Sequence, residues 1–384
     1  MDIVRVLRLS PAQRMEALRP YIELLEGDTT LWDFAARLPT REAAILAWVA
    51  WGIIPDRRQC LTCRRNLLPR VASRGFGFRW VCAERGHPTA SPRQGTFFEN
   101  THICPLQAAR LLYHFLVKHG VLFAAEECRL SRRVAIDWYN FFREVADVVQ
   151  DHDYQPIGGP DDIVEVDESH LFTRKYHRGR LLVMERRGAS QCWVFGAISR
   201  STGDMWIETI HDKRRVTLDG IMAARIRRGT YIMSDEHRSY RGCDARLGMK
   251  GHATVNHRYR FVEGMVDIDG VLPRFGGAVP DSPGIRRVPV HINTVERQWR
   301  ELKKALRTCR SRPRVPLYVG EFLYRRNVLR HLTSRGAKLR RFLEDMRRMY
   351  PGQDGYPRRV RRPGECRCDI CAPPPPPRRR VRPQ

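Results

Sequence analysis

The sequence predicts an α/β protein with a mixed β-sheet domain, preceded by a small cysteine-containing ribbon and a small helical region. From about residue 160 onward, apolar and polar residues alternate as they do in strands. Upstream, pairs of Cys and His have the spacing of metal ligands, and the segments on either side of them have the apolar spacing of helices. A chain of 384 residues is long enough for two or three domains with their own cores.

Four strands and one helix are expected in the first part of the sheet domain. The strands are "DDIVEVDESHLF", "CWVFGAISR", "DMWIETI" and "TYIMSD", and the helix "RVTLDGIMAARIRRG" precedes the fourth strand. A turn at residues 201–204 joins the second and third strands as an antiparallel hairpin, and the helical crossover returns the fourth strand parallel to the sheet. This order is that of a ribonuclease H-like sheet, and we expect the domain to span residues 158–345.

The second part of this domain contains an insertion and a late helix. The Gly- and Pro-rich segment 263–290 predicts a loop or insertion. The helix "NTVERQWRELKKALR" follows, and residues 317–349 again have a helical pattern. The expected buried stripe of the late helix is Val295, Trp299, Leu302 and Leu306.

The last segment, residues 346–384, is basic and Pro-rich, and we expect it to be disordered. It contains Cys366, Cys368 and Cys371, which form either a partial metal site or none, because a fourth ligand is not evident.

Four upstream residues have the spacing of a zinc site: Cys60, Cys63, Cys82 and His87. Two thiolates two residues apart, with a more distant Cys and His, can complete a tetrahedron around Zn²⁺. The Gly and aromatic residues between them favour a β-hairpin. We therefore expect a zinc ribbon over residues 56–104, with structural zinc because all four positions are filled. The alternative is that these residues are spaced by chance.

Helical regions lie on both sides of the ribbon. Residues 1–55 predict short helices, one of them with Thr40 as its N-cap. Residues 105–150 predict an amphipathic helix, a short helix, a break near Leu130 and Ser131, and a longer helix. The expected apolar stripe of the longer helix is Val134, Trp138, Phe141 and Val145. This arrangement resembles a helix-turn-helix, and both DNA reading and plain helical packing remain open.

The charge of the chain is unusual. There are 69 Lys and Arg against 42 Asp and Glu, a net charge of +27. Residues 297–384 hold 26 Lys and Arg against 7 Asp and Glu, which accounts for +19 of that total. This excess favours DNA or RNA as the partner, with an anionic membrane as the second possibility.

Nothing in the sequence predicts secretion or membrane insertion. The first residues lack the apolar segment of a secretory leader, and the longest apolar run, Ala43 to Ile54, is too short to span a bilayer. The 11 cysteines are unevenly spaced and include metal-type pairs, which favours a reducing compartment. We expect a nuclear location in a eukaryote and a cytoplasmic location in a bacterium.

Three acids occupy positions that could form one metal site. Asp167 lies on the first strand, Asp235 ends the fourth, and Glu296 begins the late helix. The first and fourth strands are neighbours in a ribonuclease H-like sheet, so their acids meet at one edge, where a helix can add the third. Such carboxylates suit Mg²⁺ (or Mn²⁺). Two ions about 3.5–4 Å apart would activate a water or 3′-hydroxyl at a phosphodiester.

Each acid also has a purely structural interpretation. Asp167 could cap a turn, and Asp235 could cap a helix at "EHRSY". Glu296 fits a capping box with Asn293 as the N-cap. Glu165 shares a strand face with Asp167, and Glu236 adjoins Asp235, so either neighbour could take the proposed role.

Five ordered blocks resemble the ISXO2-like (IS1595/IS1016) transposases and their eukaryotic Merlin relatives. The blocks are "VEVDESHLFTRKYHRGR", "WVFGAISRSTG", "SDEHRSY", "HATVNHRYRFV" and "HINTVERQWRELKK", and the upstream ribbon and "GTFFENT" are also similar. The resemblance covers about residues 56–345. It implies a ribonuclease H-like catalytic domain, cut-and-paste DNA transposition, and an acidic triad at Asp167, Asp235 and Glu296. The segment 263–290 is longer than the link expected in this family.

Further residues are candidates for supporting the metal site or for contacting DNA. Glu236 and His237 follow Asp235, while His257 and His291 flank the insertion and could instead be ordinary polar packing. The remaining candidates are Asn293, Arg174, Lys175 and Lys303.

The first functional hypothesis is an active transposase that binds its transposon ends and a target DNA as a homo-oligomer. The second is a domesticated transposase without catalysis that acts as a DNA-binding protein. A weaker third hypothesis is a nuclease or resolvase on the same fold without strand transfer. Cleavage of supercoiled DNA and joining to a target distinguish the three.

Overall fold

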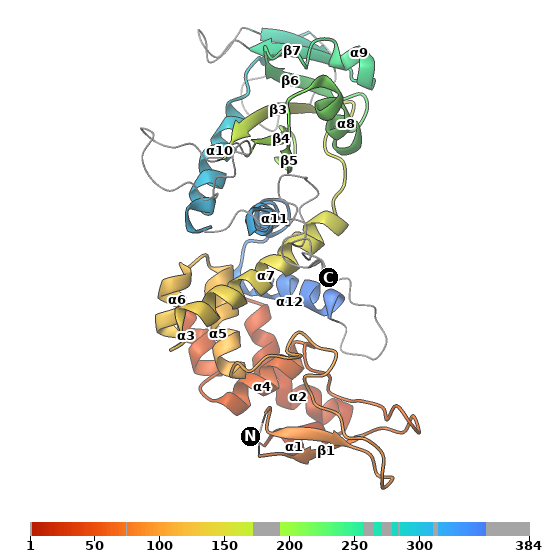
Figure 1. Cartoon of the computed structure of the whole chain (residues 1–384), viewed down its shortest axis with the longest axis vertical. Helices are drawn as coiled ribbons and strands as arrows, with labels where there is room; N and C mark the ends of the chain where they lie inside the picture. Colours follow the sequence, from red (N-terminus) through yellow and green to blue (C-terminus); the bar gives the residue numbers. More distant parts are fainter. Residues whose placement is uncertain are drawn as a thin grey trace, which may run out of the picture. The chain divides into compact units, whose positions relative to one another are not determined.

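The structure is a computed structural model that describes residues 2–73, 75–171, 193–255, 265–269, 279–282, 285–309 and 314–350. The chain divides into two compact units (Figure 1). The first contains the described residues up to Val145 and those from Leu329 onward, and the second contains the described residues from Ala146 to Val328. No helix in these ranges is long and apolar enough to cross a membrane.

The first unit is mainly helical. Its elements are α1 (Ile3–Leu7), α2 (Pro11–Ile22), η1 (Glu23–Leu25), α3 (Leu31–Arg37), α4 (Arg41–Ala50), β1 (Leu68–Val71), β2 (Phe78–Val81), α5 (Pro105–Leu116), α6 (Val121–Glu127), the first part of α7 (Arg132–His152), η5 (Leu329–His331) and α12 (Arg335–Met349). The Thr40 hydroxyl accepts a hydrogen bond from the Ala43 amide at 3.2 Å, which confirms the predicted start of α4. β1 and β2 pair antiparallel and form the predicted hairpin.

The apolar stripe of α7 differs from the prediction. The break before α7 falls at residues 128–131, as expected. Phe141, which the sequence placed in the stripe, is 39% exposed, whereas Phe142 is fully buried. The Phe142 ring packs 5.9 Å from that of Phe97 and 6.1 Å from that of Phe342. The buried stripe is Ala135, Trp138, Phe142, Val145 and Val149. Both stripes alternate steps of three and four residues, so helical spacing alone could not choose between the adjacent phenylalanines.

The second unit is built on a five-stranded mixed sheet. Its strands are β3 (Ile163–His170), β4 (Trp193–Ser199), β5 (Met205–Ile210), β6 (Tyr231–Asp235) and β7 (Gly251–Val255), in the order β5-β4-β3-β6-β7 (Figure 1). β4 is antiparallel to β3 and β5, while β6 is parallel to β3 and β7 is parallel to β6. The predicted neighbourhood of the first and fourth strands is confirmed. The sheet is compatible with a ribonuclease H-like fold, with β7 as a strand that the sequence did not predict.

The two faces of this sheet pack against different helices (Figure 1). The helices of the unit are α8 (Arg215–Arg225), α9 (Cys243–Leu247), α10 (Asn293–Ala305), η3 (Leu306–Thr308) and α11 (Val315–Asn327), together with the end of α7. The core on one face includes Ile163, Met233, Val295, Trp299 and Leu302. The core on the other includes Val164, Val166, Leu218, Met222 and Ile232. α10 therefore covers the first face and α8 the second, and the predicted stripe of α10 is buried.

The described parts of segment 263–290 form strands where the Gly and Pro content predicted a loop or insertion. The segment contains three short strands, β8 (Met265–Asp269), β9 (Val279–Ser282) and β10 (Ile285–Pro289). They form an antiparallel sheet in the order β8-β10-β9. The pairing lies within the insertion, where β10 pairs with both β8 and β9. The Gly and Pro content of the segment did not predict these strands.

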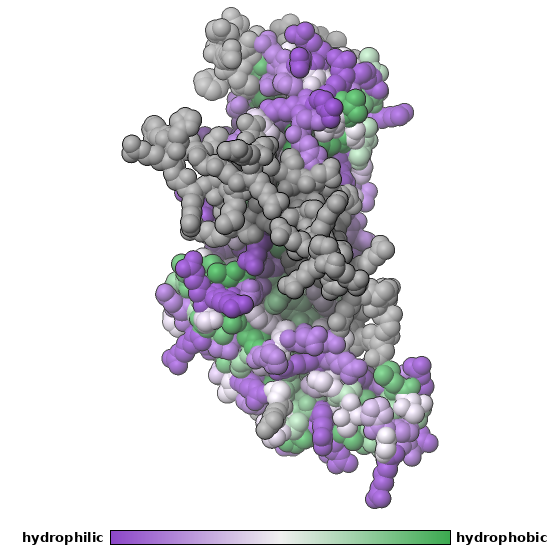
Figure 2. Space-filling view, in the orientation of Figure 1, coloured by the Kyte–Doolittle hydropathy of each residue, from purple (hydrophilic) through white to green (hydrophobic). Residues whose placement is uncertain are grey.

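The visible surface of the second unit agrees with this packing. In Figure 2 hydrophilic residues predominate on the described part of this unit, with only small hydrophobic areas between them. The apolar side chains of the central strands β3, β4 and β6 lie in the two cores instead. The polar groups of β3 that enter a core therefore need a specific explanation.

Candidate functional site

The four cysteine and histidine residues of the ribbon come together in one cluster. The ligand atoms of Cys60, Cys63, Cys82 and His87 all lie within 4.8 Å of one another. The His87 Nδ1 is 3.6 Å from the Cys60 Sγ and 3.5 Å from the Cys82 Sγ, and the Cys63 and Cys82 sulfurs are 3.6 Å apart. With metal–ligand bonds of about 2.0–2.3 Å, the edges of a tetrahedral zinc site measure roughly 3.3–3.8 Å. These three separations fit that range.

Local backbone structure explains how the cluster forms. The Arg64 amide donates to the Cys60 carbonyl at 2.8 Å, and Arg64 has a φ of 61°, so the chain turns tightly between the first two cysteines. The hairpin of β1 and β2 then returns Cys82 to the same place, directly after β2. A hydrogen bond from the Cys63 amide lowers the pKa of Cys60 to about 6. A thiol in this state is readily converted to the thiolate that binds metals.

The first acid of β3 on the α10 face is a structural group. Glu165 is 0% exposed. Its carboxylate accepts hydrogen bonds from the Thr294 amide at 2.8 Å, the Thr294 hydroxyl at 2.9 Å and the Val295 amide at 3.0 Å. The Thr294 and Val295 amides are among those that a helix leaves without intrahelical partners at its N-terminus. A carboxylate at that end also has a favourable interaction with the helix dipole.

The capping box predicted for Asn293 and Glu296 is therefore wrong. The N-cap of α10 is Ile292, Asn293 is the first helical residue, and no side chain at the N-cap makes a capping hydrogen bond. Glu165 supplies the cap from a strand 129 residues earlier in the chain. It is also not an alternative to Asp167 as a metal ligand, because its oxygens are already occupied by the helix.

Arg200 and His291 complete this arrangement, which we call the Glu165 network. The Arg200 Nε donates to Glu165 at 2.7 Å, and its terminal nitrogens donate to the carbonyls of Pro289 at 3.1 Å and His291 at 2.7 Å. The His291 Nδ1 lies 3.3 Å from the Glu165 carboxylate. Burial alone would raise the pKa of Glu165, but His291 and Arg200 outweigh it and lower that pKa. His291, a candidate for DNA or metal contact, thus anchors the start of α10.

Asp167, two residues further along β3, has different surroundings. Its Oδ2 accepts a hydrogen bond from the Trp299 indole at 2.8 Å. Burial raises the pKa of Asp167 to about 7; the Trp299 hydrogen bond opposes this rise, and the charges of Glu168 and Asp235 add to it. A carboxyl group in this condition would gain from a nearby cation, and such perturbed groups cluster at functional sites.

Asp235 lies beside Asp167 on the neighbouring strand. The parallel register pairs Glu165 with Met233, so Asp167 and Asp235 follow two residues later on the same face. The Asp235 carboxylate accepts a hydrogen bond from the His237 amide at 3.0 Å, which makes a turn rather than the predicted helix cap. Glu236 is exposed and His237 is half-buried in this turn. The next helix, α9, begins only at Cys243.

Glu296 lies in the first turn of α10 and is partly buried. Trp299 and Lys303 follow it at i+3 and i+7, and therefore lie on the same side of the helix. Burial lowers the pKa of Lys303, and the negative charge of Asp167 partly opposes this change by favouring the charged ammonium group. Within the described residues, the Cys60 cluster is the one tight group of three or more metal-ligand side chains. The convergence of Asp167, Asp235 and Glu296 on a metal therefore stays a prediction.

The remaining candidates have different outcomes. Asn293 is partly buried at the first position of α10. Arg174, Lys175 and His257 lie outside the described residues, as do Cys366, Cys368 and Cys371 of the predicted tail.

A buried acid on the opposite face of β3 was missed by sequence reasoning. Glu168 is 8% exposed, accepts a hydrogen bond from the Tyr240 hydroxyl, and lies 3.4 Å from the Lys213 Nζ. The Lys213 ammonium also lies 3.6 Å from the centre of the Trp193 ring. The sequence contains an indication of this acid. In "VEVDESH", Glu168 follows Val164 and Val166 at two-residue spacing, so strand alternation places it on the face of the valines and not on the face of Glu165 and Asp167.

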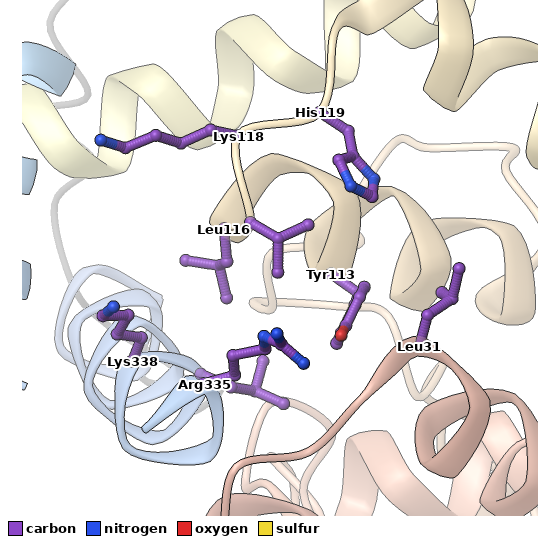
Figure 3. A pocket seen from close by; sticks show the side chains of 9 residues that line it. Leu31, Tyr113, Leu116, Lys118, His119, Arg335 and Lys338 are labelled. Carbon is purple, nitrogen blue, oxygen red and sulfur yellow. The ribbon is translucent and has the colours of Figure 1, made fainter. Parts of the chain in front are cut away.

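A pocket of about 450 Å³ lies in the first unit (Figure 3), whereas the acids belong to the second unit. It is lined by Leu31, Tyr113, Leu116, Val117, Lys118, His119, Arg335, Lys338 and Leu339. The lining combines basic and apolar side chains and includes no carboxylate. It lacks the oxygen ligands that Mg²⁺ prefers, so it is not the proposed metal site.

Comparison with known families identifies the domain that contains the acids. Residues 159–327 match the ISXO2-like transposase domain of the IS1595 family. This range includes β3, β6 and α10, and hence Asp167, Asp235 and Glu296. The resemblance found in the sequence blocks is confirmed over residues 159–327, while that of the upstream ribbon and "GTFFENT" stays a prediction. A comparison with curated proteins gives no match.

Proposed function

We propose that this chain, which carries an ISXO2-like transposase domain, cleaves DNA at the inverted repeats of a DNA transposon and joins the freed ends to a target. Asp167, Asp235 and Glu296 are the proposed catalytic acids of this DDE transposase. The main supporting observation is that Asp167 and Asp235 lie side by side on parallel strands. The helix that carries Glu296 covers the same face of the sheet.

The chemistry of these side chains fits a divalent cation. Mg²⁺ and Mn²⁺ prefer carboxylate oxygens, and the charge of Asp235 is close enough to Asp167 to contribute to the raised pKa of Asp167. When bound, two such ions would help to activate the attacking water or 3′-hydroxyl and to stabilise the leaving oxygen of the phosphodiester.

The protein's own contribution is to orient the acids and bind the DNA backbone. The His237 amide fixes one oxygen of Asp235, and the Trp299 indole fixes one oxygen of Asp167. The Glu165 network holds the first turn of α10, and with it the backbone of Glu296. Lys303 follows on the same helix side, where its positive charge can bind a phosphate close to the acids.

We propose that Cys60, Cys63, Cys82 and His87 hold a zinc ion with a structural role. The donor set of three sulfurs and one nitrogen suits Zn²⁺, and four protein ligands leave no position for a substrate. The ribbon and the α6–α7 region would then recognise the transposon ends, while Lys and Arg side chains bind phosphates. Because two ends must be cut and joined in one reaction, we propose a homo-oligomer assembled on DNA.

Cleavage of a supercoiled plasmid with paired inverted repeats tests this function. The full-length protein should produce nicked, linear and joined products only when Mg²⁺ or Mn²⁺ is added. Asp167→Asn and Asp235→Asn should each abolish these products while DNA binding is retained, because the shape of the side chain is kept. Asp161→Asn is the control, since Asp161 is an exposed acid just before β3. Binding without cleavage by the wild type would favour a non-catalytic DNA-binding protein, and cleavage without joining would favour a nuclease.

A further inference from the structure

We infer that Trp299 is a positioning residue for Asp167: its indole N–H holds one carboxylate oxygen and thereby sets which oxygen is presented to a cation. This inference rests on the proposed function, since it assigns Asp167 to the metal site. It adds a residue that the acidic triad does not include.

The hydrogen bond has the geometry and burial expected of an interaction that fixes a side chain. The indole Nε1 is 2.8 Å from the Asp167 Oδ2, and Trp299 is 5% exposed. An indole N–H is a donor only, so it can bond to the carboxylate oxygen but cannot accept from it. The Asp167 carboxylate also accepts a hydrogen bond from the Glu168 backbone, so these two hydrogen bonds decide which of its lone pairs remain for a cation.

The position of the ring is fixed by a glycine on the adjacent strand. Gly196 is the cross-strand neighbour of Asp167. A Cβ at position 196 would lie 2.7 Å from the Trp299 Cζ2, and closer still to the Cη2. Real Cβ atoms do not approach carbon this closely. The ring therefore lies directly on the backbone of β4, in space that exists only because residue 196 has no side chain.

The helix that carries Trp299 is also fixed at its start. Glu165 binds the Val295 amide, one turn before Trp299. Two acids of β3 thus hold α10 at two successive turns: Glu165 through the backbone and Asp167 through the indole. The hydrogen bonds at the helix start and the packing of the ring on Gly196 together direct the indole N–H at the Asp167 oxygen.

The alternative is that Trp299 only fills the core. A core-filling role predicts that a ring of the same shape without the N–H group preserves every property of the site. A positioning role predicts that metal affinity falls although the fold is preserved. Loss of a residue that orients a metal ligand typically lowers metal affinity about 10–100-fold.

The test compares the full-length wild type with two variants. Trp299→Phe removes the N–H and part of the ring, whereas 3-benzothienylalanine at position 299 keeps the bicyclic shape and replaces N–H by sulfur. Trp206→Phe is the matched control, because Trp206 belongs to the same core, is 6% exposed and donates its N–H to Glu208 at 3.0 Å. The readouts are the Mn²⁺ dissociation constant from electron paramagnetic resonance, and the Mg²⁺ concentration that gives half-maximal cleavage.

We expect both changes at position 299 to weaken Mn²⁺ binding about ten-fold or more, and to raise the half-maximal Mg²⁺ concentration similarly. The control Trp206→Phe should match the wild type in both measurements. Unchanged Mn²⁺ affinity of the benzothienylalanine protein would overturn the positioning role, even if every protein cleaves DNA. If Mn²⁺ affinity depends on the N–H but the wild type does not cleave, the positioning role is supported and the proposed catalytic function fails.

Discussion

The substitution Glu165→Gln tests how α10 is held on the sheet. Gln has nearly the same size and can still accept a hydrogen bond from the helix, but it removes the charge that faces Arg200. The side chain of Glu165 is 0% exposed and that of Arg200 is 10% exposed, so Arg200 would lose its counterion in a buried position. Removing one partner of a buried ion pair costs about 3–5 kcal/mol.

The free energy of unfolding of the second unit provides the measurement. The full-length protein is unfolded by heat, and the unfolding of the second unit is followed by near-ultraviolet circular dichroism. For a unit of this size, a loss of about 3–5 kcal/mol lowers Tm by roughly 6–20 °C. The control is Asp219→Asn, because Asp219 pairs with Arg246 at 2.8 Å in a more exposed place, where the loss should be about 1 kcal/mol or less.

The pH dependence provides a second check on the same variant. The pKa of Glu165 is lowered in the folded protein, so its contribution to stability is complete above its unfolded pKa of 4.5 and is lost as pH falls through the folded value. The difference between wild type and Glu165→Gln should therefore be constant at neutral pH and shrink below about pH 4.5. A variant no less stable than Asp219→Asn at pH 7 would refute the role of the Glu165 network.

Three further predictions concern the two candidate metal sites. Cys63→Ser should release zinc, detected by loss of metal from the purified protein, and unfold the ribbon while the second unit keeps its thermal transition. Glu296→Gln should abolish Mg²⁺-dependent cleavage in a protein of normal stability, since Glu296 does not cap α10; retained cleavage would remove it from the site. Because burial raises the pKa of Asp167 to about 7, the metal-free protein should lose stability as pH rises from about 4 to 7, and added Mg²⁺ should restore more stability at pH 8 than at pH 5. Equal Mg²⁺ stabilisation at both pH values would contradict this.

The regular elements could be predicted because their signals are local. Alternation identified β3, helical spacing identified α10, and the Thr40 cap identified the start of α4. The order of the first and fourth strands followed from the crossover helix between them. β7 and the three strands of the insertion were missed, since each is only four or five residues long. β7 pairs with β6, and the insertion strands pair with one another, so neither pairing is visible in the pattern of one short segment.

The residue types of the site could be predicted from the sequence, but the structural role of each residue could not. "NTVE" has the same local pattern whether Asn293 caps the helix or a distant carboxylate does, so the cap by Glu165 could be seen only in the fold. The contact between Trp299 and Asp167 joins residues 132 positions apart, and neither residue signals the other in the sequence. The Cys60 cluster was predictable because its spacing is itself the chemical signal.

The most direct test of the central claim is the location of bound Mn²⁺ by anomalous X-ray scattering in crystals of the full-length protein with transposon-end DNA. The claim predicts anomalous peaks at the α10 face of the sheet, with Asp167, Asp235 and Glu296 as ligands and the Trp299 indole on the remaining oxygen of Asp167. Mn²⁺ bound elsewhere, with none of these three acids in contact, would contradict it.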